Sequence, residues 1–280
     1  MYHYLKKFES ISEFGDFAAT LEGAKRYKNR DSAESFPLDR ETPHSLADTI
    51  KIAREGGYWE KGAANLQEVE LSGDAAPVDH RRVMRPNVVG FMPNVPALLA
   101  GQPLSMFDLP RAGEVNKLVR IGVGVTLSAN TPPKTLYNRG RALLAVVDDL
   151  VTQGYGVEVW AVIDVANASA RYNETPTCRQ TIAVQVKPSF GTWSPSSAAF
   201  MLANSSIYRR VGFNVTQTDE KLYDMIGEGM GYPEPADTIG HDVWFEGIFG
   251  SDGGTPYNTP DKALATVKER VQTFLYRDTP

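Results

Sequence analysis

Two strand-to-loop junctions, about 120 residues apart, constrain the fold of this chain more than any other feature. The first, residues 121–130, reads IGVGVTLSAN, and the second, residues 243–254, reads VWFEGIFGSDGG. Each is an apolar run that ends in small oxygen-bearing residues and is followed by a helical pattern. In an open, mostly parallel sheet, ligands bind beyond the carboxyl ends of the strands, where the strand order reverses. We therefore expect the first and fourth strands of the sheet to be adjacent and the two junctions to meet in such a crevice.

Four side chains of these junctions carry oxygen atoms that suit a metal ion. They are Thr126, Ser128, Asn130 and Asp252. Hydroxyl, amide and carboxylate oxygens are hard ligands, which favour Mg²⁺, Ca²⁺ or Mn²⁺ over zinc or copper. The four residues therefore form a candidate site for a hard divalent cation.

Composition excludes several other classes of protein. The chain has 280 residues, of which 42% are apolar, and this is enough for one large core or two ordinary ones. Its net charge of −5 offers no bulk basic field to duplex nucleic acid or to an anionic membrane. The single cysteine, Cys178, cannot close an intrachain disulfide, which favours a reducing compartment. Because the sequence also shows neither a signal peptide nor a run of roughly 20 apolar residues, we expect a cytoplasmic protein with no membrane partner.

From residue 115 onward, the hydrophobic pattern predicts an α/β fold with a doubly wound, mostly parallel sheet. The first predicted strand, residues 118–127, is a nearly continuous apolar run, as expected of a central strand covered on both faces. A polar, turn-prone stretch between the second and third strands predicts an antiparallel hairpin. The other predicted strands are 157–165, 180–186 and 242–249, and the predicted helices are 136–153, 195–210, 219–228 and one that starts at residue 260.

The N-terminal part of the chain has a different pattern. It contains two predicted helices, residues 11–22 and 43–55. Residues 86–103 include four prolines, which exclude one long helix or an inner strand. We interpret them as an ordered connector that packs against the rest of the protein and consists of a short strand, a helical turn at residues 96–100 and a stop at Gly101. We therefore expect a helical N-terminal region at residues 1–110 and an α/β domain at residues 111–280.

Three loops of the α/β part resemble those of the von Willebrand factor A family. That family forms a metal-ion-dependent adhesion site from D-x-S-x-S after the first strand, a Thr in a Gly-Thr loop after the third strand, and an Asp-Gly after the fourth. The matching residues here are Ser128, Thr192 and Asp252. Thr126 stands where the family has the leading Asp, and Asn130 stands where it has the last Ser.

This resemblance covers residues 115–280 at most and implies a von Willebrand A-like fold with a degenerate adhesion site. Its tentative metal ligands are Ser128, Thr192 and Asp252, and Trp193 follows Thr192 in the same loop. Loss of the leading carboxylate removes one of the charges that hold the ion. We therefore expect either no cofactor or weakly bound Mg²⁺ or Ca²⁺.

A second resemblance concerns residues 87–106, NVVGFMPNVPALLAGQPLSM, together with WEKG at residues 59–62. These stretches are similar to a family of uncharacterised proteins encoded by tailed bacteriophages. The similarity implies an origin in a phage, and hence the cytoplasm of a bacterial host, but it carries no known chemistry.

Enzyme signatures in the sequence are weak. Gly122 and Gly124 lie inside a strand and lack the third glycine of a dinucleotide-binding loop. There is no G-x-S-x-G elbow, and Cys178 has no evident base partner in the sequence. His241 is expected at the amino edge of the sheet, as a strand cap rather than as half of a catalytic pair. These features favour a protein that is not an enzyme.

The preferred interpretation is therefore a non-enzymatic protein-binding or assembly module that uses the degenerate metal-site surface. Such a surface either holds an ion that a partner's carboxylate completes, or contacts the partner without metal. The alternative is a nucleic-acid-binding accessory factor of phage transcription or replication, with Arg81, Arg82 and Arg85 on phosphates, joined by Arg209 and Arg210. A hydrolase is the third hypothesis.

Overall fold

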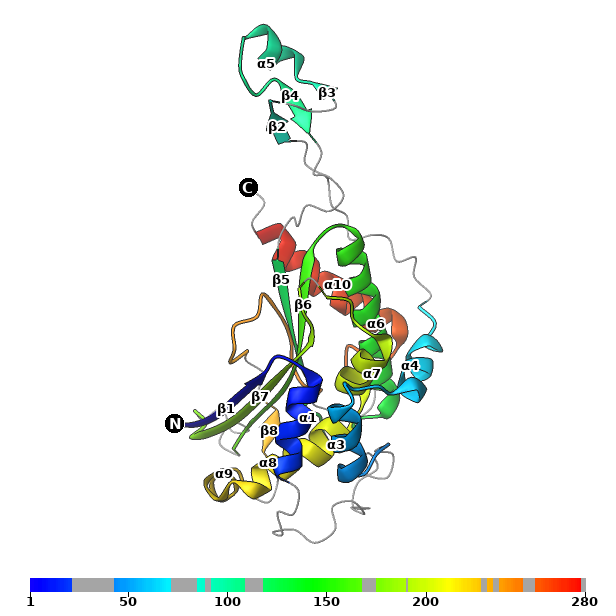
Figure 1. The fold of residues 1–280 in the computed structure, drawn as a ribbon, viewed down its shortest axis with the longest axis vertical. Helices are drawn as coiled ribbons and strands as arrows, with labels where there is room; N and C mark the ends of the chain where they lie inside the picture. Colours follow the sequence, from blue (N-terminus) through cyan, green and yellow to red (C-terminus); the bar gives the residue numbers. More distant parts are fainter. Residues whose placement is uncertain are drawn as a thin grey trace.

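Six strands form one mixed sheet at the centre of the computed structural model (Figure 1): β1 (Tyr2–Phe8), β5 (Leu118–Gly124), β6 (Gly156–Ala166), β7 (Cys178–Lys187), β8 (Tyr232–Pro233) and β9 (Val243–Phe245). The strand order is β1-β7-β6-β5-β9, and β8 pairs with the end of β6. β5 is parallel to both β6 and β9, and β1 is parallel to β7, whereas β6 and β7 are antiparallel. The structure describes residues 1–21, 43–71, 85–88, 92–108, 118–167, 175–189, 191–227, 231–233, 237–248 and 255–277.

Two expectations about strand pairing are confirmed. The second and third predicted strands, now β6 and β7, form an antiparallel pair in which Asp164 lies opposite Thr181. The first and fourth predicted strands, now β5 and β9, are adjacent and parallel, with Ile121 opposite Val243. The fold is therefore of the α/β class, with more parallel than antiparallel pairs in the sheet.

Apart from α5 (Val95–Leu99), the helices of the described residues lie on one face of the sheet (Figure 1). That face carries Ile121, Ile163 and Ile182, whose side chains are buried. The prediction of helices on both faces is wrong for the described part of the chain, because the helices after β7 return to the same face, where the Gln180 side chain donates to the Gly212 carbonyl. The helices are α1 (Ile11–Thr20), α3 (Leu46–Arg54), α4 (Glu60–Gln67), α6 (Pro133–Thr152), α7 (Pro195–Ala203), a π-helix η3 (Ile207–Gly212), α8 (Phe213–Thr218), α9 (Glu220–Ile226) and α10 (Pro260–Arg277).

The N-terminal region contributes to the sheet as well as to the helical layer. β1 pairs with β7 along its whole length, which differs from the prediction of a purely helical region. Phe8 at the end of β1 and Phe14 of α1 are buried, and their rings meet edge to face with centroids 5.7 Å apart. The sequence signal for β1 is weak because this edge strand has a partner on one side only and carries Lys6 and Lys7. The first residues of the chain therefore belong to the same core as the later strands.

α1 and α3 approach each other closely because Gly15 stands at their contact. A Cβ atom at Gly15 would collide with the backbone of Ala53 and Arg54, so only glycine fits there. Ser45 caps α3 through the Asp48 amide, at a distance of 3.1 Å, within the helix predicted at residues 43–55.

A second, smaller sheet stands apart from the main body (Figure 1). It consists of β2 (Arg85–Asn87), β3 (Met92–Pro93) and β4 (Met106–Asp108), with α5 (Val95–Leu99) between β3 and β4. We call residues 85–88 and 92–108 the projecting sheet. Leu99 of α5 is 83% exposed, so the expectation that this connector packs against the rest of the protein is wrong for the described residues. The predicted helix stop at Gly101 is confirmed, since α5 ends at Leu99 and Gly101 has a φ of +68°.

No helix within the described ranges is both long enough and apolar enough to cross a membrane.

Phe14→Ala should destabilise the whole protein if the N-terminal region shares its core. Phe14 is fully buried, and phenylalanine-to-alanine changes at such positions cost about 3–5 kcal/mol. In urea denaturation followed by fluorescence and circular dichroism, we expect one transition with a lower midpoint. The control is Leu5→Ala on β1, because Leu5 is 46% exposed and its change should cost less than about 0.5 kcal/mol. An early separate transition that leaves the α/β part folded would contradict a shared core.

Candidate functional site at the ends of β5 and β9

The two junctions meet beyond the carboxyl ends of β5 and β9. The Ile248 amide donates to the Thr126 carbonyl, and the Ser128 amide donates to the Ile248 carbonyl, each at 2.9 Å. Since β5 has β6 on one side and β9 on the other, this is the point where the strand order reverses. The adjacency of the two junctions that the sequence predicts is therefore confirmed for the described residues, which on the second junction end at Ile248.

Thr126 lies at this edge, but its side chain holds two strands of the sheet together. Its side chain is 1% exposed, and its hydroxyl donates to the Asp164 carbonyl and accepts from the Asp164 amide, both at 3.0 Å. These two bonds fasten the end of β5 to β6. The hydroxyl is therefore already engaged and is not presented to a ligand.

Ser128 and Asn130 lie in the turn that follows. Ser128 is half-buried and Asn130 is exposed. The Thr131 amide donates to the Ser128 carbonyl at 3.0 Å, and the Asn130 amide contacts the Ser128 hydroxyl at 3.4 Å. This turn presents small polar groups on a backbone that is fixed at its base by Ile248.

Thr192 and Trp193 lie at the opposite edge of the sheet, so the expectation of one pocket that includes them is wrong. The Trp193 ring nitrogen donates to the Asp148 carboxylate, at 3.2 Å, near the C-terminal end of α6. The reason is the direction of β7: because it runs antiparallel to β6, it ends at the amino edge of β5 and β6. The short segment before α7 leaves Thr192 at that edge.

Several predicted site residues cannot be placed. Asp252, Arg81 and Arg82 lie outside the described residues, and Arg85 is described only as backbone in β2. Arg209 and Arg210, proposed for phosphate contact, are buried in η3, where the Arg209 guanidinium lies 4.6 Å from the centroid of the Phe213 ring. Neither is presented to a nucleic-acid backbone.

A buried arginine lies beneath the ends of β5 and β9, and the sequence analysis did not identify it. Arg139 of α6 is fully buried, and its Nη1 donates to the Gly124 carbonyl at 2.9 Å and to the Glu246 carbonyl at 3.2 Å. It therefore joins the ends of β5 and β9. Burial lowers the pKa of Arg139 from its usual value, while Tyr257 and Glu246 raise it. An arginine remains charged even so.

The described residues of this edge do not fit a hard cation. Of the three tentative metal ligands, only Ser128 lies at this edge among the residues that the structure describes. No group of three or more His, Cys, Asp or Glu side chains among the described residues could hold a metal. The Arg139 guanidinium beneath the strand ends is positively charged and repels a divalent ion.

Glu246 follows β9, and Arg270 of α10 engages its carboxylate. Two guanidinium nitrogens of Arg270 donate to the two carboxylate oxygens at 2.8 and 2.9 Å, and Nη1 also donates to the Trp244 carbonyl. The hydrogen bonds from Arg270 are the main cause that lowers the pKa of Glu246. The pair closes the outer side of β9 and leaves the Glu246 carboxylate engaged.

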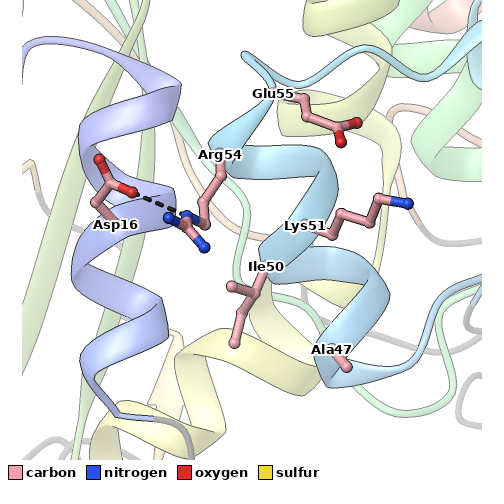
Figure 2. Close-up of a pocket in the computed structure, with 6 residues that line it drawn as sticks. All are labelled: Asp16, Ala47, Ile50, Lys51, Arg54 and Glu55. Carbon is pink, nitrogen blue, oxygen red and sulfur yellow. Dashed lines mark hydrogen bonds and ion pairs between the residues drawn. The ribbon is translucent and has the colours of Figure 1, made fainter.

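Two grooves lie elsewhere on the described surface. One, of about 500 Å³, runs between β9 and α10 and is lined by Asp242, Trp244, Glu269 and Phe274 among others. The other, of about 410 Å³, lies between α1 and α3, where Arg54 and Asp16 form an exposed ion pair (Figure 2). Figure 2 shows this ion pair bridging the two helices and Ile50 pointing into the space between them. Both grooves are open and mixed in polarity.

A polar cluster covers part of the sheet face opposite to the helices. The buried carboxylate of Asp164 accepts hydrogen bonds from Thr181 at 3.1 Å and from Thr238 at 2.6 Å. His3 contacts the Thr181 hydroxyl at 2.8 Å. Asp164, which follows the apolar run at residues 159–163 inside a predicted strand, was the available signal for this cluster.

His241 lies next to this cluster and pairs with Asp237. Its Nδ1 is 3.0 Å from the Asp237 carboxylate, its ring fills the space above Gly122, and its Nε2 is buried without a partner. Burial raises the pKa of Asp237, but hydrogen bonds from the His241 ring and from the amides of Ile239 and His241 outweigh it and lower the pKa to about 2.

Comparison with known proteins gives a family but no activity. A family model described as a domain of unknown function, DUF7192, matches residues 2–270, so the chain belongs to that family. No curated protein matches the chain. No solved structure matches it either.

Asp237 should make the stability of the protein depend on acid pH. Its carboxylate is 14% exposed, and its pKa is about 2 in the folded protein against an ordinary 3.8. Because its pKa is lower in the folded protein than in the unfolded chain, the Asp237 carboxylate stabilises the fold at pH values above its ordinary pKa. This contribution of about 2 kcal/mol to the free energy of unfolding is lost as the pH falls from about 4 to about 2. In urea denaturation at several pH values, Asp237→Asn should flatten this part of the profile. Asp224→Asn, at an exposed position on α9, is the control and should leave the profile unchanged.

Divalent cations should bind weakly or not at all. Calorimetric titration with Mg²⁺, Ca²⁺ and Mn²⁺ should show no micromolar binding, because the site lacks the two or more carboxylates of tight hard-cation sites and because the Thr126 hydroxyl is already engaged. Micromolar affinity that disappears in Ser128→Ala would show that the metal site is functional.

Proposed function

We propose that this protein is a non-enzymatic protein-binding or assembly module that contacts a partner protein through the projecting sheet. The observation that carries the proposal is the exposure of large apolar side chains there. Leu98 and Leu99 of α5 are 55% and 83% exposed. Val88, Met92, Val95 and Leu104 of the same short segment are also exposed. Single exposed apolar residues are ordinary, but a group of them on one segment is typical of an interaction site.

The helical backbone of α5 is preformed for such a contact. The Asn94 side chain accepts from the Ala97 amide at the start of the helix, and Pro96 lies in the first turn. Asn94 itself donates its amide to the Ser105 carbonyl at 2.8 Å, which ties the start of the helix to the approach to β4. A preformed helix loses less conformational entropy on binding than a flexible loop does.

The proposal extends to the type of fold and to the origin of the chain. We assign the main sheet to the von Willebrand A-like type, and the parallel adjacency of β5 and β9 next to the antiparallel β6 and β7 supports this. We assign the chain to a tailed bacteriophage, on the resemblance of residues 87–106, which overlap the projecting sheet. In this proposal the turn with Ser128 and Asn130 is a second, metal-free contact surface.

The Leu98→Asp, Leu99→Asp double variant should lose its partner. Burial of each leucine contributes about 1.5–3 kcal/mol, so binding should weaken by at least about tenfold. The measurement is capture of partner proteins from a lysate of the native host, quantified by mass spectrometry. Light scattering of the purified protein reports in parallel whether the partner is a second copy of this chain.

The matched control is Val151→Asp. Val151 of α6 is an apolar residue of the main body that is 44% exposed, so the same change of charge should leave capture intact. Unchanged capture by the double variant would contradict the proposed surface. Binding of oligonucleotides by the wild type would favour the nucleic-acid hypothesis, and turnover of nucleotides, esters or peptides would favour the hydrolase.

A further inference from the structure

Arg139 has one edge of its guanidinium unused. Nη1 holds the carbonyls of Gly124 and Glu246, whereas Nε and Nη2 are buried without a hydrogen-bond partner. Nε and Nη2 lie on the same edge of the planar group, and their N–H bonds form the fork that matches two oxygens of a carboxylate or a phosphate. A fork of this kind with no acceptor is costly inside a protein.

Two buried hydroxyls at this end of the sheet also have no hydrogen-bond partner. The hydroxyl of Tyr257, which is 2% exposed, has no partner, and the ring of Tyr257 has its centroid 5.7 Å from the Arg139 guanidinium. Thr131, in the turn before α6, is also buried with an unpartnered hydroxyl. Hydroxyls can donate or accept, but Nε and Nη2 can only donate. Nε and Nη2 therefore need acceptor atoms.

Glu246 acts on Arg139 as a counter-charge, but Arg139 shares it with Arg270. The Glu246 carboxylate is engaged by Arg270 on both of its oxygens. The N-terminus of α6, a helix of 20 residues, has no side-chain cap and adds positive potential at this end of the sheet. An isolated buried charge costs several kcal/mol unless it is paired.

The geometry points to a binding site for a small oxyanion, a phosphate or carboxylate group held bidentately by Nε and Nη2 of Arg139. The Tyr257 hydroxyl donates a further hydrogen bond to it. The site lies beneath the ends of β5 and β9. It prefers an anion, whereas the sequence suggests a metal cation at this edge. It stands independently of the contact proposed for the projecting sheet.

Thermal melting of the refolded protein in phosphate, acetate and chloride at equal ionic strength tests the site. Refolding from urea in chloride removes any ion that was bound before. We expect a rise of about 3 °C in Tm at a concentration of the preferred anion near ten times its Kd. A rise in phosphate alone identifies a phosphate site, and a rise in acetate alone identifies a carboxylate site. Equal melting of the wild type in all three salts would overturn the inference.

Arg139→Lys keeps the charge but removes the fork, so it should abolish the rise. Tyr257→Phe removes one hydroxyl and should reduce the rise in Tm. This second variant tests the site even if Arg139→Lys fails to fold. The control is Arg141→Lys, two residues further along α6 and therefore on a different side of the helix, which should retain the full rise. Equal rises in the wild type and in Arg139→Lys would show a general salt effect and would also overturn the inference.

Discussion

The hydrogen bonds at the end of β5 are the constraint on which the rest of the structure depends. β5 is the strand that has parallel partners on both sides, and its last residues are held by three different elements. Thr126 fastens it to β6 through Asp164, Ile248 fastens it to the chain after β9, and Arg139 of α6 binds the Gly124 carbonyl. These bonds join β5 to both of its neighbours in the sheet and to the first helix that follows it.

The same region explains why we infer an anion site at a place where the sequence resembles a metal centre. Ser128 has the position that the resemblance implies, but the Thr126 hydroxyl is engaged and a buried guanidinium lies beneath the strand ends. Positive charge and an excess of donors favour an anion at this place, just as clustered carboxylates would favour a cation. The sign of the local charge decides between an anion and a cation.

The projecting sheet differs from the rest of the chain in how it uses apolar residues. In the main body, residues such as Phe14, Ile121 and Phe200 are buried between the sheet and the helices. In the projecting sheet, Leu98 and Leu99 are exposed while the backbone is ordered by pairing within the segment itself. A partner surface would complete the burial that the chain does not provide.

The sequence alone determined the elements whose signals are local. Continuous apolar runs gave β5, β6 and β7 to within a few residues, and Pro260 and Gly101 marked the start of α10 and the end of α5, because these signals act on the neighbouring backbone. Tertiary structure decided the rest. The direction of β7 separates Thr192 from Ser128. β1 is a strand because it pairs with β7, which lies far away in the sequence. The buried environment of Arg139 is likewise created by strands that are distant in the sequence. Burial and unsatisfied hydrogen bonds depend on what surrounds a side chain in space, and no local pattern of residues encodes them.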